Sequence, residues 1–200
     1  MSEETTLQRD LVINGGGILV REDKVLSEKE VLGLVKKGDR EAYQEIVIRY
    51  MKRAYYIALG FVQNPQDAMD LSQESFIRAF RKIKSFNTQM PFFPWFYRLM
   101  KNLCIDFLKR SSNHKEVPLE EVHVLKEERE DRELKEVLWR GIEKLPMEQK
   151  EVVILRYFQQ MSYQEIAEMT GKPAGTVMSS LFYAKKRLKK IIGRFLGIKE

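Results

Sequence analysis

The sequence predicts an all-α protein: two helical domains joined by a flexible linker, the C-terminal one containing a helix-turn-helix. Apolar residues recur at helical spacing from residue 27 onward, and no alternating strand pattern follows residue 26. Capping boxes, and a proline at a first helical position, mark where helices begin. A stretch without periodicity, residues 111–131, interrupts the helices and is the expected linker.

Composition limits the class of protein and of partner. Two hundred residues suit one or two compact domains, and a hydrophobic fraction of 44% suffices for packed cores. The net charge of +6 favours a polyanionic partner, and it is concentrated in two blocks. Segment Ser75–Arg110 has eight basic residues and one acid, while Gly171–Lys199 has eight basic residues and no acid.

The single cysteine and the lack of long apolar runs indicate the cellular compartment of the protein. Cys104 cannot form an internal disulfide, fits a reducing compartment and lies in an apolar helix, so we expect it to be buried. No apolar run approaches a membrane span, and the N-terminus lacks the features of a signal peptide. We therefore expect a cytoplasmic protein without membrane insertion.

The elements of the N-terminal half follow from local signals. Residues 1–26 form an arm without an assigned role, either a small hairpin or flexible, because three glycines separate short apolar runs. Ser27 and Glu30 form a capping box, and Asn64 with Pro65 is a strong helix start. In order, residues 27–110 then give a helix opened by Ser27, a longer helix over Ala42–Ala58, a helix from Pro65 to about Lys84, a break at Ser85–Pro94 and a helix from Trp95 to Arg110.

Residues 132–197 form the predicted C-terminal domain, and within it Met161–Arg187 has the pattern of a helix-turn-helix. Helices before it are separated by Pro146. Ser162 and Glu165 form a capping box, Gly171 stands where a left-handed residue is needed, and a second helix begins around Gly175-Thr176. Its apolar stripe comprises Val177, Leu181, Ala184 and Leu188.

The opposite face and flanks of that second helix are predicted to contact DNA. A short capped helix, a glycine turn and a helix with a polar outer face are typical of a motif that reads the major groove. A generic helical hairpin is the alternative, which the absence of acids from Gly171 to Lys199 disfavours. The outward residues are Thr176, Met178, Ser179, Ser180, Phe182, Tyr183, Lys186 and Arg187.

The helix that starts at Pro65 has an acidic side. Asp67, Asp70 and Glu74 follow at spacings of three and four residues, so they share one face, with Gln73 beside them. Three carboxylates could hold Mg²⁺ for a nuclease or nucleotidyl transferase, but no His, Lys or second acidic cluster lies nearby in the sequence. We therefore favour a solvated face or a protein-docking face over a metal site, and of these two we prefer a face that docks a basic partner.

Segment Phe76–Phe107 combines aromatic and basic residues in a way that suits unpaired nucleic acid. It holds nine of the chain's 21 aromatic residues, most of which must be core. On the helix from Trp95, however, one polar stripe carries Arg98, Lys101, Asn102, Asp106 and Lys109. Cations can follow the phosphates while aromatic rings stack on the bases, and each stacked base contributes about 1–3 kcal/mol.

Catalysis has no support in the sequence. His114 and His123 have no Cys or His partner at metal spacing, and no Ser/His/Asp set is plausible. We expect neither an enzyme, nor a cofactor, nor a metal site.

Several of these motifs, in the same order, resemble the extracytoplasmic-function (ECF) sigma factors of bacterial RNA polymerase, over about residues 27–197. Asp67-Ala-Met-Asp70-Leu-Ser-Gln73-Glu74-Ser-Phe76 is similar to the family segment that binds the polymerase clamp helices. Phe93-Pro-Trp95-Phe-Tyr97-Arg98, continuing to Asp106, resembles the segment that reads the melted minus-ten element. The helix-turn-helix resembles the reader of the minus-thirty-five element.

The resemblance implies a promoter-specificity subunit. Residues 27–110 would be sigma region 2 and residues 132–197 sigma region 4, and the partners would be core RNA polymerase, promoter DNA as duplex and melted strand, and an anti-sigma factor. It also implies the residues of three interfaces. They are Asp67, Asp70, Gln73 and Glu74 for polymerase, Asn87, Thr88, Trp95, Arg98, Lys101 and Asn102 for the minus-ten element, and the outward residues listed above for the minus-thirty-five element.

Two departures from the family pattern bear on specificity. Met69 replaces the usual acid on the polymerase-binding segment, so that contact differs in detail. Phe182-Tyr183 replace a commonly basic pair, and Met178 and Ser180 also stand at commonly basic positions, which favours apolar contacts such as those to thymine methyl groups.

Two other classes of protein remain as alternatives. A conventional helix-turn-helix regulator would bind duplex operators as a dimer, but it would leave Phe76–Phe107 without a function, and no dimerisation heptad is visible. A metal-dependent nucleic-acid enzyme is the least favoured. The sequence does not indicate the promoter, the inducing signal or the role of residues 1–26.

Overall fold

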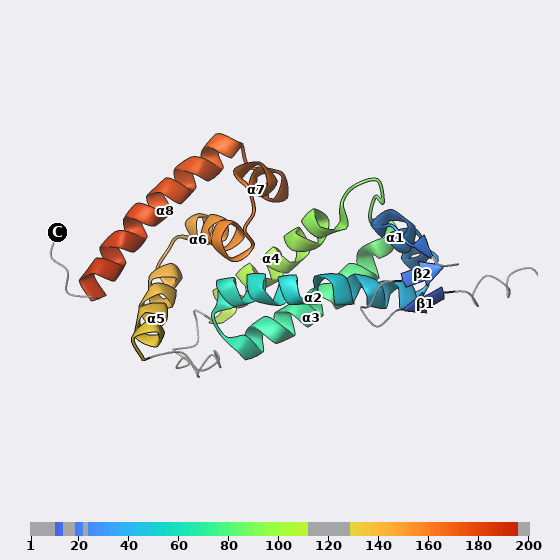
Figure 1. The fold of residues 1–200 in the computed structure, drawn as a ribbon, viewed down its shortest axis with the longest axis horizontal. Helices are drawn as coiled ribbons and strands as arrows, with labels where there is room; N and C mark the ends of the chain where they lie inside the picture. Colours follow the sequence, from blue (N-terminus) through green and yellow to red (C-terminus); the bar gives the residue numbers. More distant parts are fainter. Residues whose placement is uncertain (1–10, 14–18, 22–23, 112–128, 196–200) are drawn as a thin grey trace, which may run out of the picture.

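The computed structural model describes residues 11–13, 19–21, 24–111 and 129–195, and its architecture is all-α, as predicted (Figure 1). The exception is a small antiparallel sheet near the N-terminus, in the order β1-β2-β3. Its strands are β1 (Leu11–Ile13), β2 (Leu19–Arg21) and β3 (Lys24–Val25). Of the two alternatives for the arm, the hairpin is therefore present.

Among the described residues before 112 there are four α-helices, and the first three begin at capping residues. They are α1 (Glu28–Lys36), α2 (Arg40–Val62), α3 (Pro65–Lys82) and α4 (Phe92–Ser111). The Ser27 side chain accepts from the backbone N–H of Glu30, completing the predicted capping box. Asn64 caps α3 by accepting from the backbone N–H of Asp67, with Pro65 at the first helical position.

Several predicted boundaries in this half differ from the structure by a few residues, and α2 extends beyond the predicted Ala42–Ala58 at both ends. α3 ends at Lys82, and a 3₁₀ turn, η1 (Ile83–Ser85), follows it. α4 begins at Phe92, three residues before the expected Trp95, so Pro94 lies inside its first turn. A proline is tolerated there because the first N–H groups of a helix have no intrahelical acceptor.

Four further helices follow the undescribed residues 112–128, which contain most of the predicted linker. They are α5 (Arg129–Glu143), α6 (Met147–Val153), α7 (Tyr163–Thr170) and α8 (Ala174–Phe195). α5 begins within the range predicted as linker. A π-helical turn, η2 (Ile154–Phe158), continues α6, where the sequence predicted plain helix.

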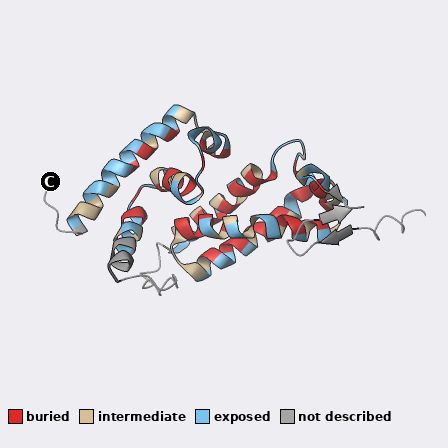
Figure 2. Ribbon diagram, in the orientation of Figure 1, coloured by how far each residue is buried: buried red, intermediate tan, exposed pale blue. Residues whose placement is uncertain are grey.

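The helix-turn-helix has the predicted local structure. Ser162 and Glu165 form the capping box of α7, and Gly171 ends that helix in the left-handed conformation, with φ of 72°. On α8, Val177, Leu181 and Ala184 are buried in the core, while the opposite side is exposed (Figure 2). The apolar stripe predicted from the spacing is therefore the face by which α8 packs.

The two groups of helices pack against each other through buried residues. α6 and η2 contact α2, and α7 contacts α4, so that α6 and α7 lie between α8 and the first four helices (Figure 1). Buried residues of both groups form one connected cluster, which includes Phe61 of α2 and Leu155 of η2. Cys104 is buried in α4, as predicted.

The capping box makes the stability of α7 testable. We expect Ser162→Ala to lower the free energy of unfolding by about 1 kcal/mol, because it removes the acceptor for an N–H at the helix start. Urea denaturation followed by circular dichroism measures this. The control is Gln164→Ala, an exposed change on the same helix for which we expect a change of at most about 0.5 kcal/mol. Equal effects of the two substitutions would contradict the capping role.

Candidate nucleic-acid and protein interfaces

The acidic face, defined as Asp67, Asp70, Gln73 and Glu74, lies on one side of α3. Asp70 and Gln73 are exposed, and Asp67 and Glu74 are half-buried. Partial burial and, secondarily, the neighbouring Asp70 charge raise the pKa of Asp67. Within the part of the chain that the structure describes, no three acidic, histidine or cysteine residues gather as a metal site would require. The geometry fits a surface that meets a basic partner.

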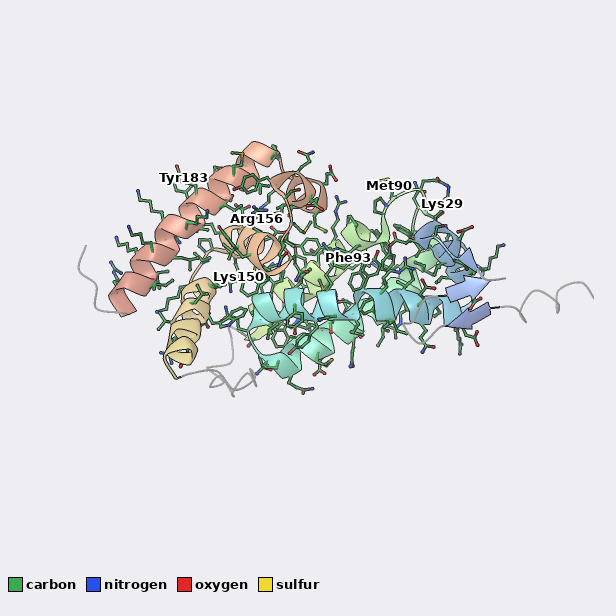
Figure 3. The ribbon with its side chains drawn as sticks, in the orientation of Figure 1. Lys29, Met90, Phe93, Lys150, Arg156 and Tyr183 are labelled. Atoms are coloured by element: carbon green, nitrogen blue, oxygen red, sulfur yellow. The ribbon has the colours of Figure 1, made fainter. Side chains whose placement is uncertain are left out.

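The loop before α4 is shaped by Asn87. Its side-chain Oδ1 accepts the backbone N–H of Gln89 at 3.0 Å, and its carbonyl accepts that of Met90 at 3.0 Å. Lys29 of α1 donates to the side chain of Gln89 at 2.9 Å and so ties the loop to the first helix. Met90 is 60% exposed (Figure 3). Asn87 is exposed and the adjacent Thr88 half-buried, so this ordered turn presents polar and apolar groups together.

Trp95 is only partly available at the surface. Its ring packs against Phe86, with centroids 4.7 Å apart, and against Phe92 at 5.6 Å. Phe86 and Phe92 are buried, whereas Trp95 is half-buried. Most aromatic rings of this segment are core, as expected, and Trp95 forms the boundary between that core and solvent.

The polar stripe of α4 is present but unevenly exposed. Arg98 and Asn102 are exposed, whereas the Lys101 side chain is only 22% exposed. The reason is that Lys101 Nζ lies 2.5 Å from Oε1 of Glu151, on α6. The sequence grouped Arg98, Lys101 and Asn102 correctly but missed this partner.

Glu151 is the centre of a buried cluster, which we call the Glu151 cluster: Tyr97, Lys101, Glu151 and Lys172. The carboxylate is 1% exposed, and its Oε1 also accepts from the Tyr97 hydroxyl at 2.8 Å. Lys172, in the turn before α8, lies 3.5 Å from Oε2. Burial, and then the Glu151 charge, raise the pKa of the Tyr97 hydroxyl well above its ordinary value, so it remains a donor.

The outward side of α8, the recognition face, carries the residues predicted to contact DNA. Thr176, Ser179, Lys186 and Arg187 are exposed, and Ser180 is half-buried. Its large apolar members are unusually accessible. Met178 is 53%, Phe182 63% and Tyr183 57% exposed, and the last two rings pack edge to face with centroids 5.4 Å apart.

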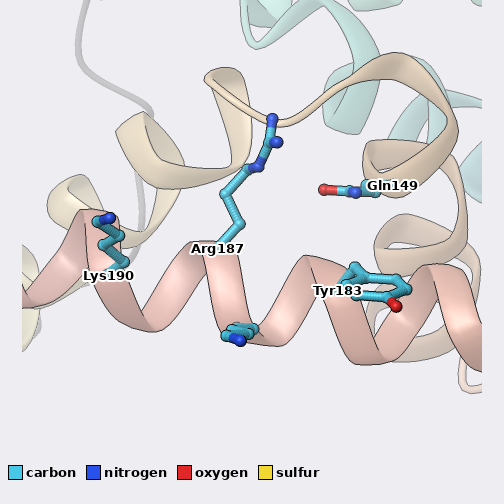
Figure 4. Close-up of a pocket in the computed structure, with 5 residues that line it drawn as sticks. Gln149, Tyr183, Arg187 and Lys190 are labelled. Atoms are coloured by element: carbon cyan, nitrogen blue, oxygen red, sulfur yellow. The ribbon is translucent and has the colours of Figure 1, made fainter.

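A hollow of about 360 Å³ extends the recognition face towards α6 (Figure 4). It is lined by Gln149, Tyr183, Lys186, Arg187 and Lys190. Three cations around one concavity suit an anion such as a phosphate group. The buried Oε1 of Gln149 has no hydrogen-bond partner among the described residues, so this side chain has unused bonding capacity.

Sequence reasoning missed Glu151, Gln149 and Lys190. Lys190 lies in the basic block, so a longer helical wheel of α8 would have found it. No local signal marks Glu151 and Gln149, because both lie on the short α6 and meet groups that are distant in the sequence.

Comparison with known protein families finds two matches. The model of sigma-70 region 2 matches residues 46–114, and the model of sigma-70 region 4 matches residues 135–188. A relative is the ECF RNA polymerase sigma factor SigW of Bacillus subtilis, 30% identical over 81% of this chain and 95% of that protein. Another is the ECF RNA polymerase sigma-E factor of Salmonella typhimurium, 30% identical over 83% of this chain and 92% of that protein.

Solved structures agree on the fold. CnrH in complex with the cytosolic domain of CnrY is similar with a TM-score of 0.65 and 20% identity, covering 84% of this chain and 97% of that chain. The sigma factor RpoE in complex with the anti-sigma factor NepR, from Bartonella quintana, has a TM-score of 0.58 and 19% identity, covering 75% and 96%. Across the residues that the structure describes, no helix is long and apolar enough to cross a membrane.

Substitutions at two neighbouring residues of α8 distinguish the side that packs in the core from the side that faces solvent. We expect Leu181→Ala to lower the free energy of unfolding by about 2–5 kcal/mol, because Leu181 is 2% exposed and its loss leaves a cavity. Phe182→Ala, at a residue 63% exposed, should change it by about 0.5 kcal/mol or less. Thermal and urea denaturation compare the two. A large destabilisation by Phe182→Ala would mean that the recognition face is a packing surface.

Proposed function

The chain belongs to the ECF sigma factors, the promoter-specificity subunits of bacterial RNA polymerase, and from this premise we propose which of its residues perform each part of that function. The acidic face docks the core polymerase. Arg98, Lys101 and Asn102, with the loop at Asn87–Pro91 and the edge of Trp95, bind the melted minus-ten element. The recognition face binds the minus-thirty-five duplex.

The exposure of Met178, Phe182 and Tyr183 carries the proposal for the upstream element. Large apolar groups in water favour burial against a partner, and these three stand on the outer side of the second helix of a helix-turn-helix. In a major groove, such side chains meet the methyl groups of thymine. Thymine-rich positions are therefore the expected specificity of this surface.

The hollow beside Tyr183 positions the helix on the duplex. Lys186, Arg187 and Lys190 line it and would bind backbone phosphate, which fixes register without reading sequence. Gln149, rotated so that its amide nitrogen faces the hollow, would add a neutral donor. This assignment extends the upstream interface beyond the second helix of the motif to α6.

A duplex-binding regulator that acts without polymerase is the weaker alternative. It would use the recognition face in the same way but would need neither the acidic face nor the stripe on α4. Family membership favours the sigma factor. We also propose that the protein acts in the cytoplasm and has no catalytic activity of its own. Because the structures of CnrH and RpoE are complexes, the second with a named anti-sigma factor, we propose an anti-sigma partner here too.

Transcription with the purified protein tests the residue assignments. Core polymerase, genomic fragments and the protein should give discrete start sites that share two upstream motifs. We expect Phe182→Ala to lower transcripts that depend on the minus-thirty-five motif by about tenfold, the equivalent of roughly 1.4 kcal/mol. Unchanged transcripts with Phe182→Ala would contradict the upstream assignment, and duplex binding without polymerase binding would favour the regulator.

A charge reversal tests the docking role of the acidic face. We expect Glu74→Lys to weaken binding to core polymerase at least tenfold, because a basic partner would then meet a like charge. Glu41→Lys is the matched control, an exposed charge reversal in the first turn of α2 and outside the acidic face. Polymerase affinity is measured by fluorescence anisotropy. Equal losses with both variants would show a general charge effect rather than a docking site.

A further inference from the structure

The two groups of helices meet at the buried carboxylate of Glu151, which lies in one group and has hydrogen-bond donors in both. The Glu151 carboxylate on α6 accepts from Tyr97 at 2.8 Å and from Lys101 at 2.5 Å, both on α4. Lys172 completes the surroundings from the turn before α8, 3.5 Å from Oε2. Three donors from two groups of helices, two of them cationic, therefore surround one carboxylate that is 1% exposed.

A second contact fixes the distance between the groups. Ile154 of η2 lies directly over Gly60 of α2, where a Cβ would come within 2.7 Å of Cγ1 and 2.9 Å of Cδ1 of Ile154. Such distances are too short for two carbon atoms, so only glycine permits this approach. Earlier on α2, Arg53 covers the ring of Phe93 at 4.0 Å and lies 3.5 Å from Sδ of Met161.

This packing uses residues that the proposed function assigns to DNA. Lys101 already pairs with a carboxylate, so a phosphate that binds its ammonium group would have to compete with Glu151. Arg98, its neighbour on the stripe, reaches the helix-turn-helix turn, where a Cβ on Gly171 would lie 3.8 Å from Nη2. A melted strand that follows the stripe on α4 would have to displace α6 and α7.

We propose that Glu151 is an intramolecular latch: it holds Lys101 in a closed arrangement that covers the minus-ten interface, and a DNA phosphate replaces it when the two groups separate. The part that concerns DNA rests on the proposed function. A phosphate can replace Glu151 because the free energy of a buried ion pair is little lower than that of its two separated, hydrated ions. On opening, Glu151 regains water while Lys101 gains a new anionic partner.

A wedge at Gly60 tests the closed arrangement without altering any proposed DNA contact. We expect Gly60→Val to increase the radius of gyration in small-angle X-ray scattering, because the added side chain would collide with Ile154. Gly33→Val is the matched control: the same change in helix α1, where a Cβ meets nothing within 4 Å. Gly33→Val should scatter like the unaltered protein. An unchanged radius for folded Gly60→Val would overturn the proposal.

A second pair of variants removes the charge and leaves the packing shape. Glu151→Gln should open the protein and bind a fluorescent single-stranded oligonucleotide of random sequence several-fold more tightly, since Lys101 is released. Glu168→Gln, at an exposed acid on α7 outside the Glu151 cluster, is the control and should do neither. Opening without tighter binding would overturn the role of the latch in covering DNA contacts, while the closed arrangement would stand.

Different experiments would contradict the latch and the proposed function. Scattering requires neither DNA nor polymerase, so opening by Gly60→Val and Glu151→Gln would stand even if no variant bound either. Conversely, a protein that initiates transcription but scatters identically in all variants would keep its function and lose the latch.

Discussion

The carboxylate of Glu151 imposes a strict requirement on this structure, because a charge withdrawn from water must be met by hydrogen-bond donors. The donors come from α4 and from the turn before α8, so the helix-turn-helix and the helix with the polar stripe are held to one arrangement. The contact of Ile154 with Gly60 then sets how closely they approach. The accessibility of the polar stripe on α4 follows from this junction.

The two proposed DNA interfaces differ in whether the junction covers them. The recognition face of α8 points away from it and keeps its aromatic side chains in water, ready to bind without rearrangement. The stripe on α4 lies against it, with Lys101 already engaged. A protein in this state would meet the duplex upstream element first and would expose the reader of the melted strand afterwards. That order suits initiation, in which the duplex is bound before it opens.

Local rules explain what the sequence predicted well. The capping boxes at Ser27 and Ser162, the proline start of α3 and the glycine end of α7 all depend on groups within about four residues of each other, so the chain itself specifies them. The packing stripe of α8 follows from helical periodicity. The start of α4 was misplaced because Pro94 reads as a break in sequence, although the first turn of a helix tolerates it.

The sequence by itself therefore determined most of the helices, their faces and the family resemblance, and with these the helix that carries each candidate interface. Only the tertiary structure decided which residues of those interfaces are accessible and which are already engaged within the protein. Tyr97 and Glu151 are 54 residues apart, and residues 112–128 between them carry no periodic pattern that would fix their meeting. Burial is a property of surfaces brought together in space, so a sequence pattern can place Lys101 on a polar stripe but cannot reveal the carboxylate that already occupies it.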